Sequence, residues 1–167
     1  MSEVRRERLG LGIAAVDPGR SKCGLAVTDQ AGKTVVAAAI LPPDAGLALL
    51  LQWQEQGLGL VVLGNGTGSR SWQSQLAQSG LASQQLDEWG TTLAARQRYW
   101  QLEPPRGWRR CLPEGLRLPP RDIDDVVAQL LLERHLGRPL ERRCREVWRH
   151  LPDPADGPTA SKSAPAR

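Results

Sequence analysis

The first apolar run of the chain, from Leu9 to Val16, constrains the fold more than any other feature. Its small and branched side chains predict a buried β-strand. The run stops at Asp17, directly before the turn-forming pair Pro18-Gly19. Two more short apolar runs follow, Cys23–Thr28 and Thr34–Leu41, and only short polar turns separate the three. This pattern predicts an antiparallel meander.

After the meander, helices and strands are expected to alternate. Helical patterns cover residues 44–56, 72–79, 91–100, 122–136 and 139–150, and strand patterns cover 58–63 and 81–86. A meander that leads into alternating helices and strands predicts an α/β fold. The expected sheet is mixed and has five strands, three antiparallel and then parallel ones, with helices on both faces. This is the order of elements in the RNase H-like fold.

The chain is long enough for one domain with a buried core. With 167 residues, of which 40% are hydrophobic, we expect a folded domain over 9–150, a flexible N-terminus over 1–8 and a disordered, proline-rich tail over 151–167. No apolar run reaches the roughly 18 residues of a membrane span, and the charged first residues lack the apolar centre of a secretory signal. The three cysteines are far apart and odd in number, which argues against disulfides or structural zinc. We therefore expect a cytoplasmic protein.

Arginines are concentrated in one part of this basic chain, whose formal net charge is +4. The segment from Arg98 to Arg121 holds six arginines and only two glutamates, and residues 102–120 within it hold five prolines, which predicts a long loop. The planar guanidinium group suits phosphate, so a polyanionic partner such as nucleic acid is expected. An ordinary arginine-rich surface is the alternative. Trp100 and Trp108 lie among these arginines, either to stack on unpaired bases or to pack the core.

Three acidic positions fall where predicted elements end or begin. Asp17 ends the first strand, Glu88 follows the strand over 81–86, and Asp124 begins the long C-terminal helix, with Asp125 as its alternative. Carboxylates that converge at one rim repel each other unless a cation joins them, and Mg²⁺ or Mn²⁺ suits such oxygen ligands. Bound ions of this kind can activate water and stabilise the leaving oxygen when a phosphodiester is hydrolysed. Taken singly, each acid is also explained as a turn residue or a helix cap.

Three segments resemble the YqgF (RuvX) family of Holliday-junction resolvase-like nucleases, in its cyanobacterial-type branch. The stretch Gly12–Asp29, with its Asp-Pro-Gly end and its Gly-Leu-Ala-Val return strand, resembles the opening of that family. The segment Asp87–Thr92 resembles the family's Asp-Glu-Arg-Leu-Thr-Thr motif, with Trp89 in place of the arginine. The stretch Asp124–Glu133 resembles its final Asp-Ser-x-Ala-Ala helix. Together the resemblance covers about residues 9–137.

The resemblance implies a metal-dependent nuclease of RNase H-like fold, with one catalytic acid from each segment: Asp17, Glu88 and Asp124. Mg²⁺ or Mn²⁺ would be held by these three and by Asp125. It implies two substrates, four-way DNA junctions and the precursor of small-subunit ribosomal RNA, which the sequence does not separate. Cleavage of a symmetric junction calls for a homodimer. The basic residues expected to contact the nucleic acid are Arg20, Lys22, Arg98, Arg106, Arg109 and Arg110.

Two other functions compete with this one. The first is a catalytically inactive nucleic-acid-binding module of the same fold, which the change at Trp89 favours. The second is an ATP-binding protein of the actin and sugar-kinase type, but such proteins need two domains and this chain has length for one. The glycine-rich loop from Gly64 to Ser69 would suit a phosphate, although it lacks the Lys-Ser/Thr ending of a P-loop.

Overall fold

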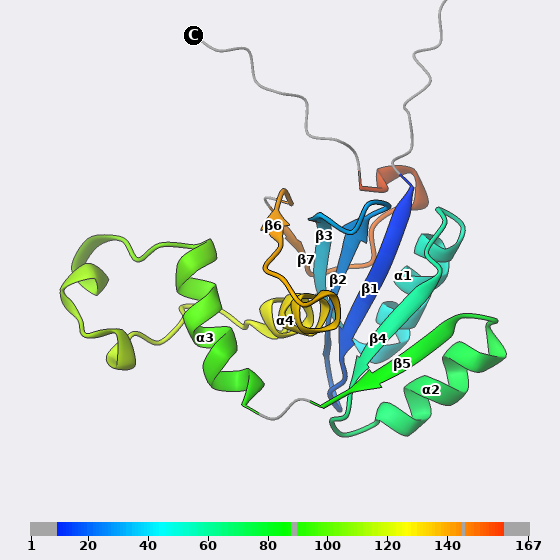
Figure 1. Ribbon diagram of the computed structural model, residues 1–167, viewed down its shortest axis with the longest axis horizontal. Helices are drawn as coiled ribbons and strands as arrows, with labels where there is room; N and C mark the ends of the chain where they lie inside the picture. Colours follow the sequence, from blue (N-terminus) through cyan, green and yellow to red (C-terminus); the bar gives the residue numbers. More distant parts are fainter. Residues whose placement is uncertain (1–9, 88–89, 145, 159–167) are drawn as a thin grey trace, which may run out of the picture.

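Three antiparallel strands form the centre of the fold: β1 (Leu11–Asp17), β2 (Cys23–Asp29) and β3 (Thr34–Leu41). The computed structural model describes residues 10–87, 90–144 and 146–158. Within these ranges it shows an α/β fold with a mixed sheet (Figure 1). The predicted meander is therefore confirmed, and its turns are as short as the sequence indicates.

Two parallel strands extend the sheet beside β1. Strand β4 (Leu60–Gly64) pairs in parallel with β1, and β5 (Ala82–Leu86) pairs in parallel with β4. The order across the sheet is β5-β4-β1-β2-β3-β6, so β1 has a hydrogen-bonded neighbour on each side. Because β1, β4 and β5 run in the same direction, their carboxyl ends lie at one edge of the sheet (Figure 1). Asp17 is the last residue of β1 at this edge.

Helices cover both faces of the sheet, as the sequence predicts. On one face lie α1 (Pro43–Gln54) and α2 (Ser69–Gln78), whose buried side chains join a core cluster with β1, β2, β3 and β4. On the other face α4 (Asp124–Leu136) packs against Ala15 of β1 and Ala26 of β2. These two faces follow from the alternation of side chains along a strand.

Helix α3 (Thr91–Leu102) does not lie on the sheet. It packs on α4 through a small separate cluster in which Ala95 and Tyr99 meet Val126. Beyond α3, residues 103–120 form an excursion that we call the arginine arm, which reaches away from the sheet before α4 begins (Figure 1). The long loop expected over 102–120 is therefore present, and it contains two short 3-10 turns.

The expected helix over 139–150 is wrong. This segment contains two short strands, β6 (Glu141–Arg142) and β7 (Val147–Trp148), which both pair in parallel with β3. The sheet therefore has seven strands rather than five within the described part of the chain. The physical reason is that β3 would otherwise present unpaired backbone groups at the edge, and the segment supplies partners for them. Arg143 N–H, for instance, donates to the carbonyl of Val35 at 2.9 Å.

The first residues of the expected tail have a defined arrangement. The amide of Gln52 in α1 donates to the carbonyl of Pro152, and Pro154–Asp156 form a 3-10 turn. The expectations for the N-terminus over 1–8, for Glu88 and Trp89, and for the rest of the tail concern residues outside those that the structure describes. In the described ranges no helix is both long and apolar enough to cross a membrane.

Gly24 in β2 permits the closest approach between α4 and the sheet. A Cβ atom at this position would lie 2.0 Å from the carbonyl oxygen of Asp124, well inside van der Waals contact. Only a residue without a side chain therefore lets the first turn of α4 rest on β2. In the sheet register Gly24 is opposite Asp17. The contact thus sets where the start of α4 lies relative to the end of β1.

We predict that Gly24→Ala destabilises the protein by about 1–3 kcal/mol, because the added methyl group must displace the backbone of α4. Urea denaturation followed by circular dichroism measures this change. Gly115→Ala is the matched control, since a Cβ atom there meets nothing within 4 Å. Equal stability of the two variants would show that α4 does not depend on the contact.

Candidate active site

Asp17 and Asp124 lie at the same edge of the sheet. Asp17 ends β1 opposite Gly24, and the backbone of Asp124 rests on that glycine. The pKa of the neighbouring Cys23 thiol is raised to about 12, mainly by burial and in addition by the negative charges of Asp17 and Asp124. The structure therefore brings the first and third of the predicted acids together. Asp17 ends β1 and Asp124 begins α4, and these two elements, far apart in the sequence, come together only in the folded chain.

Lys22 bridges two acids at the start of α4. Its ammonium nitrogen lies 2.8 Å from Oδ2 of Asp122 and 3.4 Å from Oδ2 of Asp124. The hydrogen bond to Asp122 is the main reason why the pKa of Lys22 is raised, and the same bond lowers the pKa of Asp122. Lys22, expected to contact nucleic acid, is thus held at the acidic edge. Sequence reasoning did not single out Asp122, which lies just before α4.

The second acidic segment begins at the same edge. Asn65, directly after β4, donates to Oδ1 of Asp87 at 3.0 Å, and Arg134 of α4 donates to the Asp87 carbonyl at 3.2 Å. Glu88 follows directly but is not among the described residues. The glycine-rich loop from Gly64 to Ser69 also lies here, between β4 and α2. The start of the second acidic segment and the glycine-rich loop therefore lie at the edge of the sheet where β1 ends at Asp17.

The donor set for a metal is incomplete in the described residues. Among them, no group of three histidine, cysteine, aspartate or glutamate side chains is arranged to hold an ion. Asp17 and Asp124 supply two carboxylates, which are the oxygen ligands that Mg²⁺ or Mn²⁺ prefers. The third predicted ligand, Glu88, lies outside the described residues. The two carboxylates of the described residues are thus compatible with a divalent ion but do not form a complete set of ligands by themselves.

Asp125, expected as an alternative ligand, has a different role. Its side chain is fully buried, and its two oxygens accept from Nη1 of Arg121 at 2.8 Å and from Nη2 of Arg142 at 2.5 Å. Arg121 also contacts Glu103 at 2.7 Å. Asp125 therefore balances two arginines inside the protein, and this geometry disfavours a metal at its carboxylate. We call Asp125, Arg121, Arg142 and Glu103 the Asp125 cluster.

Arg98 is also engaged inside the protein rather than available to nucleic acid. Its guanidinium group donates from Nε and Nη2 to Glu133 of α4, at 3.1 and 2.8 Å, and from Nη2 to the carbonyl of Leu140 at 2.9 Å. Glu133 itself is buried. The expected contact between Arg98 and phosphate is therefore not supported. This arginine holds α3 against α4 and the turn that follows α4.

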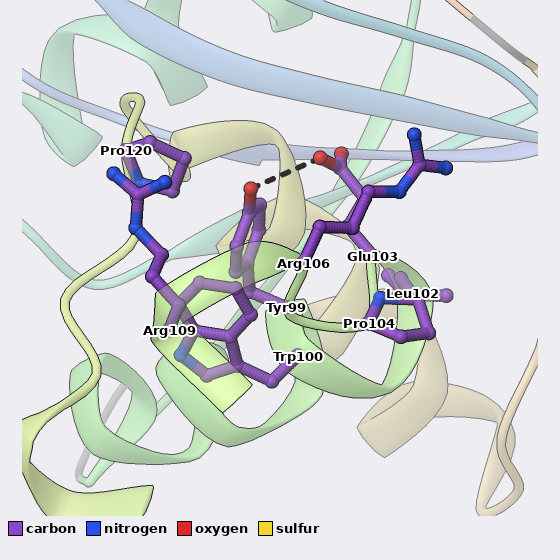
Figure 2. A pocket seen from close by; sticks show the side chains of 8 residues that line it. All are labelled: Tyr99, Trp100, Leu102, Glu103, Pro104, Arg106, Arg109 and Pro120. Carbon is purple, nitrogen blue, oxygen red and sulfur yellow. Dashed lines mark hydrogen bonds between the residues drawn. The ribbon is translucent and has the colours of Figure 1, made fainter. Parts of the chain in front are cut away.

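Four of the expected nucleic-acid contacts face solvent at least in part. Arg20, Arg106 and Arg110 are exposed, and Arg109 is half-buried. The guanidinium carbon of Arg109 lies 5.3 Å from the ring centroid of Trp108, a cation–π contact. Figure 2 shows Arg106 and Arg109 around a cavity of about 400 Å³ beside Trp100. The arginine arm thus offers cations to a partner, whereas Arg98 and Arg121 do not.

We predict that Asp125→Asn and Asp124→Asn differ sharply in stability, although the residues are adjacent. Asp125→Asn leaves the largely buried guanidinium group of Arg142 without its carboxylate and removes one of the two carboxylates that Arg121 binds, which costs about 3–5 kcal/mol. Asp124→Asn removes a favourable charge from a helix N-terminus and should cost less than about 1 kcal/mol. Urea denaturation of both variants gives the comparison. A small loss for Asp125→Asn would mean that its ion pairs contribute little.

The edge of the sheet thus combines two neighbouring carboxylates, a lysine that bridges the start of α4, and a glycine-rich loop. The arginine arm lies beyond it. Comparison with known proteins assigns no family, because no family model matches the chain and no curated protein matches it.

Proposed function

We propose that the chain is a metal-dependent nuclease of the RNase H-like fold that hydrolyses phosphodiester bonds in structured nucleic acid. The observation that carries this proposal is the contact of α4 with Gly24, because it brings Asp124 to the edge where Asp17 ends β1. The order of the strands and the resemblance to the YqgF family support it further.

In this proposal Asp17, Asp124 and Glu88 hold Mg²⁺ or Mn²⁺. The bound ion would act as a Lewis acid that activates water and stabilises the leaving oxygen. Strand pairing fixes the position of Asp17, and the backbone contact with Gly24 fixes that of Asp124. The positive end of the α4 dipole lies at this edge as well, and it favours carboxylates and phosphate there.

Lys22 and Arg20 supply positive charge beside these carboxylates. Lys22 already contacts Asp124, so its ammonium group lies where a phosphate next to the scissile bond would arrive. Arg20 is exposed in the turn after Asp17. Both cations offset the repulsion between the acidic edge and a polyanionic substrate.

The competing proposal is a nucleic-acid-binding module of the same fold without catalysis. It is favoured by the ion pairs of Lys22, which balance Asp122 and Asp124 without a divalent ion. A panel of labelled four-way DNA junctions and small-subunit ribosomal RNA precursors, incubated with Mg²⁺, Mn²⁺ or EDTA, separates the two functions and the two substrates. Cleavage of a junction at symmetric positions would also point to a homodimer.

We predict that Asp17→Asn lowers the cleavage rate by on the order of 10³-fold, since several kcal/mol of stabilisation by the ion would be lost. Substrate binding should persist or improve, because one negative charge near the phosphates is gone. Asp44→Asn is the matched control, since Asp44 is exposed on α1, across the sheet from α4. Cleavage by Asp17→Asn at the wild-type rate would contradict the metal role of Asp17.

A further inference from the structure

A cavity of about 400 Å³ lies between the end of α3 and the arginine arm (Figure 2). One wall carries the indole of Trp100, which is held in place because its Nε1–H donates to the carbonyl of Arg117 at 3.1 Å. Tyr99 meets that indole edge-on, with the ring centroids 4.8 Å apart. Arg106 and Arg109 line the same cavity. The cavity therefore combines a fixed aromatic wall with two cationic side chains.

This combination suits a nucleobase attached to phosphate. Tryptophan and arginine stack on the flat faces of bases, and the volume lies within the range of small-ligand sites. The single acid in the cavity wall, Glu103, is already engaged by the Tyr99 hydroxyl at 3.0 Å and by Arg121 at 2.7 Å. Its negative charge is thus offset. Stacking without specific hydrogen bonds to base edges would accept any of the bases.

A second cavity of about 770 Å³ adjoins the first, and Leu102, Glu103 and Arg106 line both. It adds Arg149 and two arginines of the Asp125 cluster, so cations dominate its lining. Arg121 and Arg142 are committed to Asp125, but Arg106 and Arg149 are exposed. The second cavity therefore suits phosphate groups rather than bases.

The second cavity is connected to the acidic edge by a series of ion pairs. Nη1 of Arg149 lies 3.9 Å from Oδ2 of Asp122, the same oxygen that binds Lys22. Lys22 in turn contacts Asp124. A strand whose backbone lies along this surface would pass from Asp124, over Arg149 and Arg106, to the cavity beside Trp100.

We propose that the cavity beside Trp100 binds an unpaired nucleobase of the substrate strand, while phosphates of that strand cross the neighbouring arginine-lined cavity toward Asp124. The role of this pocket next to a cleavage point rests on the proposed nuclease function. The ligand is an unpaired strand rather than a duplex, because paired bases do not present a free face to a pocket of this size. The pocket binds one base and does not distinguish between the bases.

The test measures the binding of a fluorescently labelled single-stranded DNA of ten nucleotides by anisotropy, with EDTA present to prevent cleavage. The same strand with abasic sites keeps the phosphates but lacks bases, and it should bind roughly tenfold more weakly. Trp100→Leu should abolish this difference, and Trp100→Phe, which keeps an aromatic face, should retain most of it. Circular dichroism of both variants checks that α3 remains folded.

Charge variants test the path of the phosphates independently of Trp100. Arg106→Gln should weaken binding of normal and abasic strands alike, and should reduce the slope of log affinity against log salt by about one. Arg70→Gln is the matched control, because Arg70 is exposed on α2, which covers the other face of the sheet. It should leave both affinity and slope unchanged.

Three results would overturn the proposal: equal binding of normal and abasic strands, tighter binding of a blunt duplex than of the single strand, or binding of a free nucleoside monophosphate as tight as that of the strand. Its failure is distinct from failure of the nuclease function. Base-dependent binding without metal-dependent cleavage refutes the nuclease and keeps the pocket. Metal-dependent cleavage together with equal binding of normal and abasic strands refutes the pocket and keeps the nuclease.

Discussion

The contact between the first turn of α4 and Gly24 determines how the rest of the site is arranged. There is no space for a Cβ atom between β2 and the carbonyl of Asp124, so helix and strand meet backbone to backbone. Small side chains beneath α4, Ala15 and Ala26, continue this close packing along the sheet. As a result, Asp124 is fixed beside the end of β1, while Asp125, one residue on, is turned into the protein and fully buried.

The burial of Asp125 connects the acidic edge to the arginine arm. Its carboxylate binds Arg121, which precedes α4, and Arg142 of β6, while Arg121 also binds Glu103 at the end of α3. One buried charge thus ties together the segments that enter and leave the arm. The arm can therefore extend away from the sheet while both of its ends remain fixed, which keeps the cavity beside Trp100 at a defined place relative to Asp124.

The central strands and the end of β1 at Asp17 could be predicted from the sequence, because continuous apolar runs and strong turn-forming residues are local signals. The segment over 139–150 could not, since its two short strands exist only because β3 offers an unpaired edge. Counting charge in the sequence likewise grouped Arg98 with the exposed arginines. Only the fold shows that buried Glu133 binds Arg98, and that Asp125 pairs with two arginines inside the protein while Asp124 contacts Lys22 at the edge of the sheet. In the sequence, Asp122 is recognisable only as a residue near the start of a helix, and nothing there predicts its ion pairs with Lys22 and Arg149.

In the proposed function, Asp17 and Asp124 share a divalent ion at the end of β1. Electron paramagnetic resonance of added Mn²⁺ measures bound against free ion directly, without any substrate. We predict specific Mn²⁺ binding to the wild-type protein that is lost in Asp17→Asn and in Asp124→Asn, while Asp44→Asn binds as the wild type does. Mn²⁺ binding that is absent from the wild type, or that survives in both single variants, would contradict it.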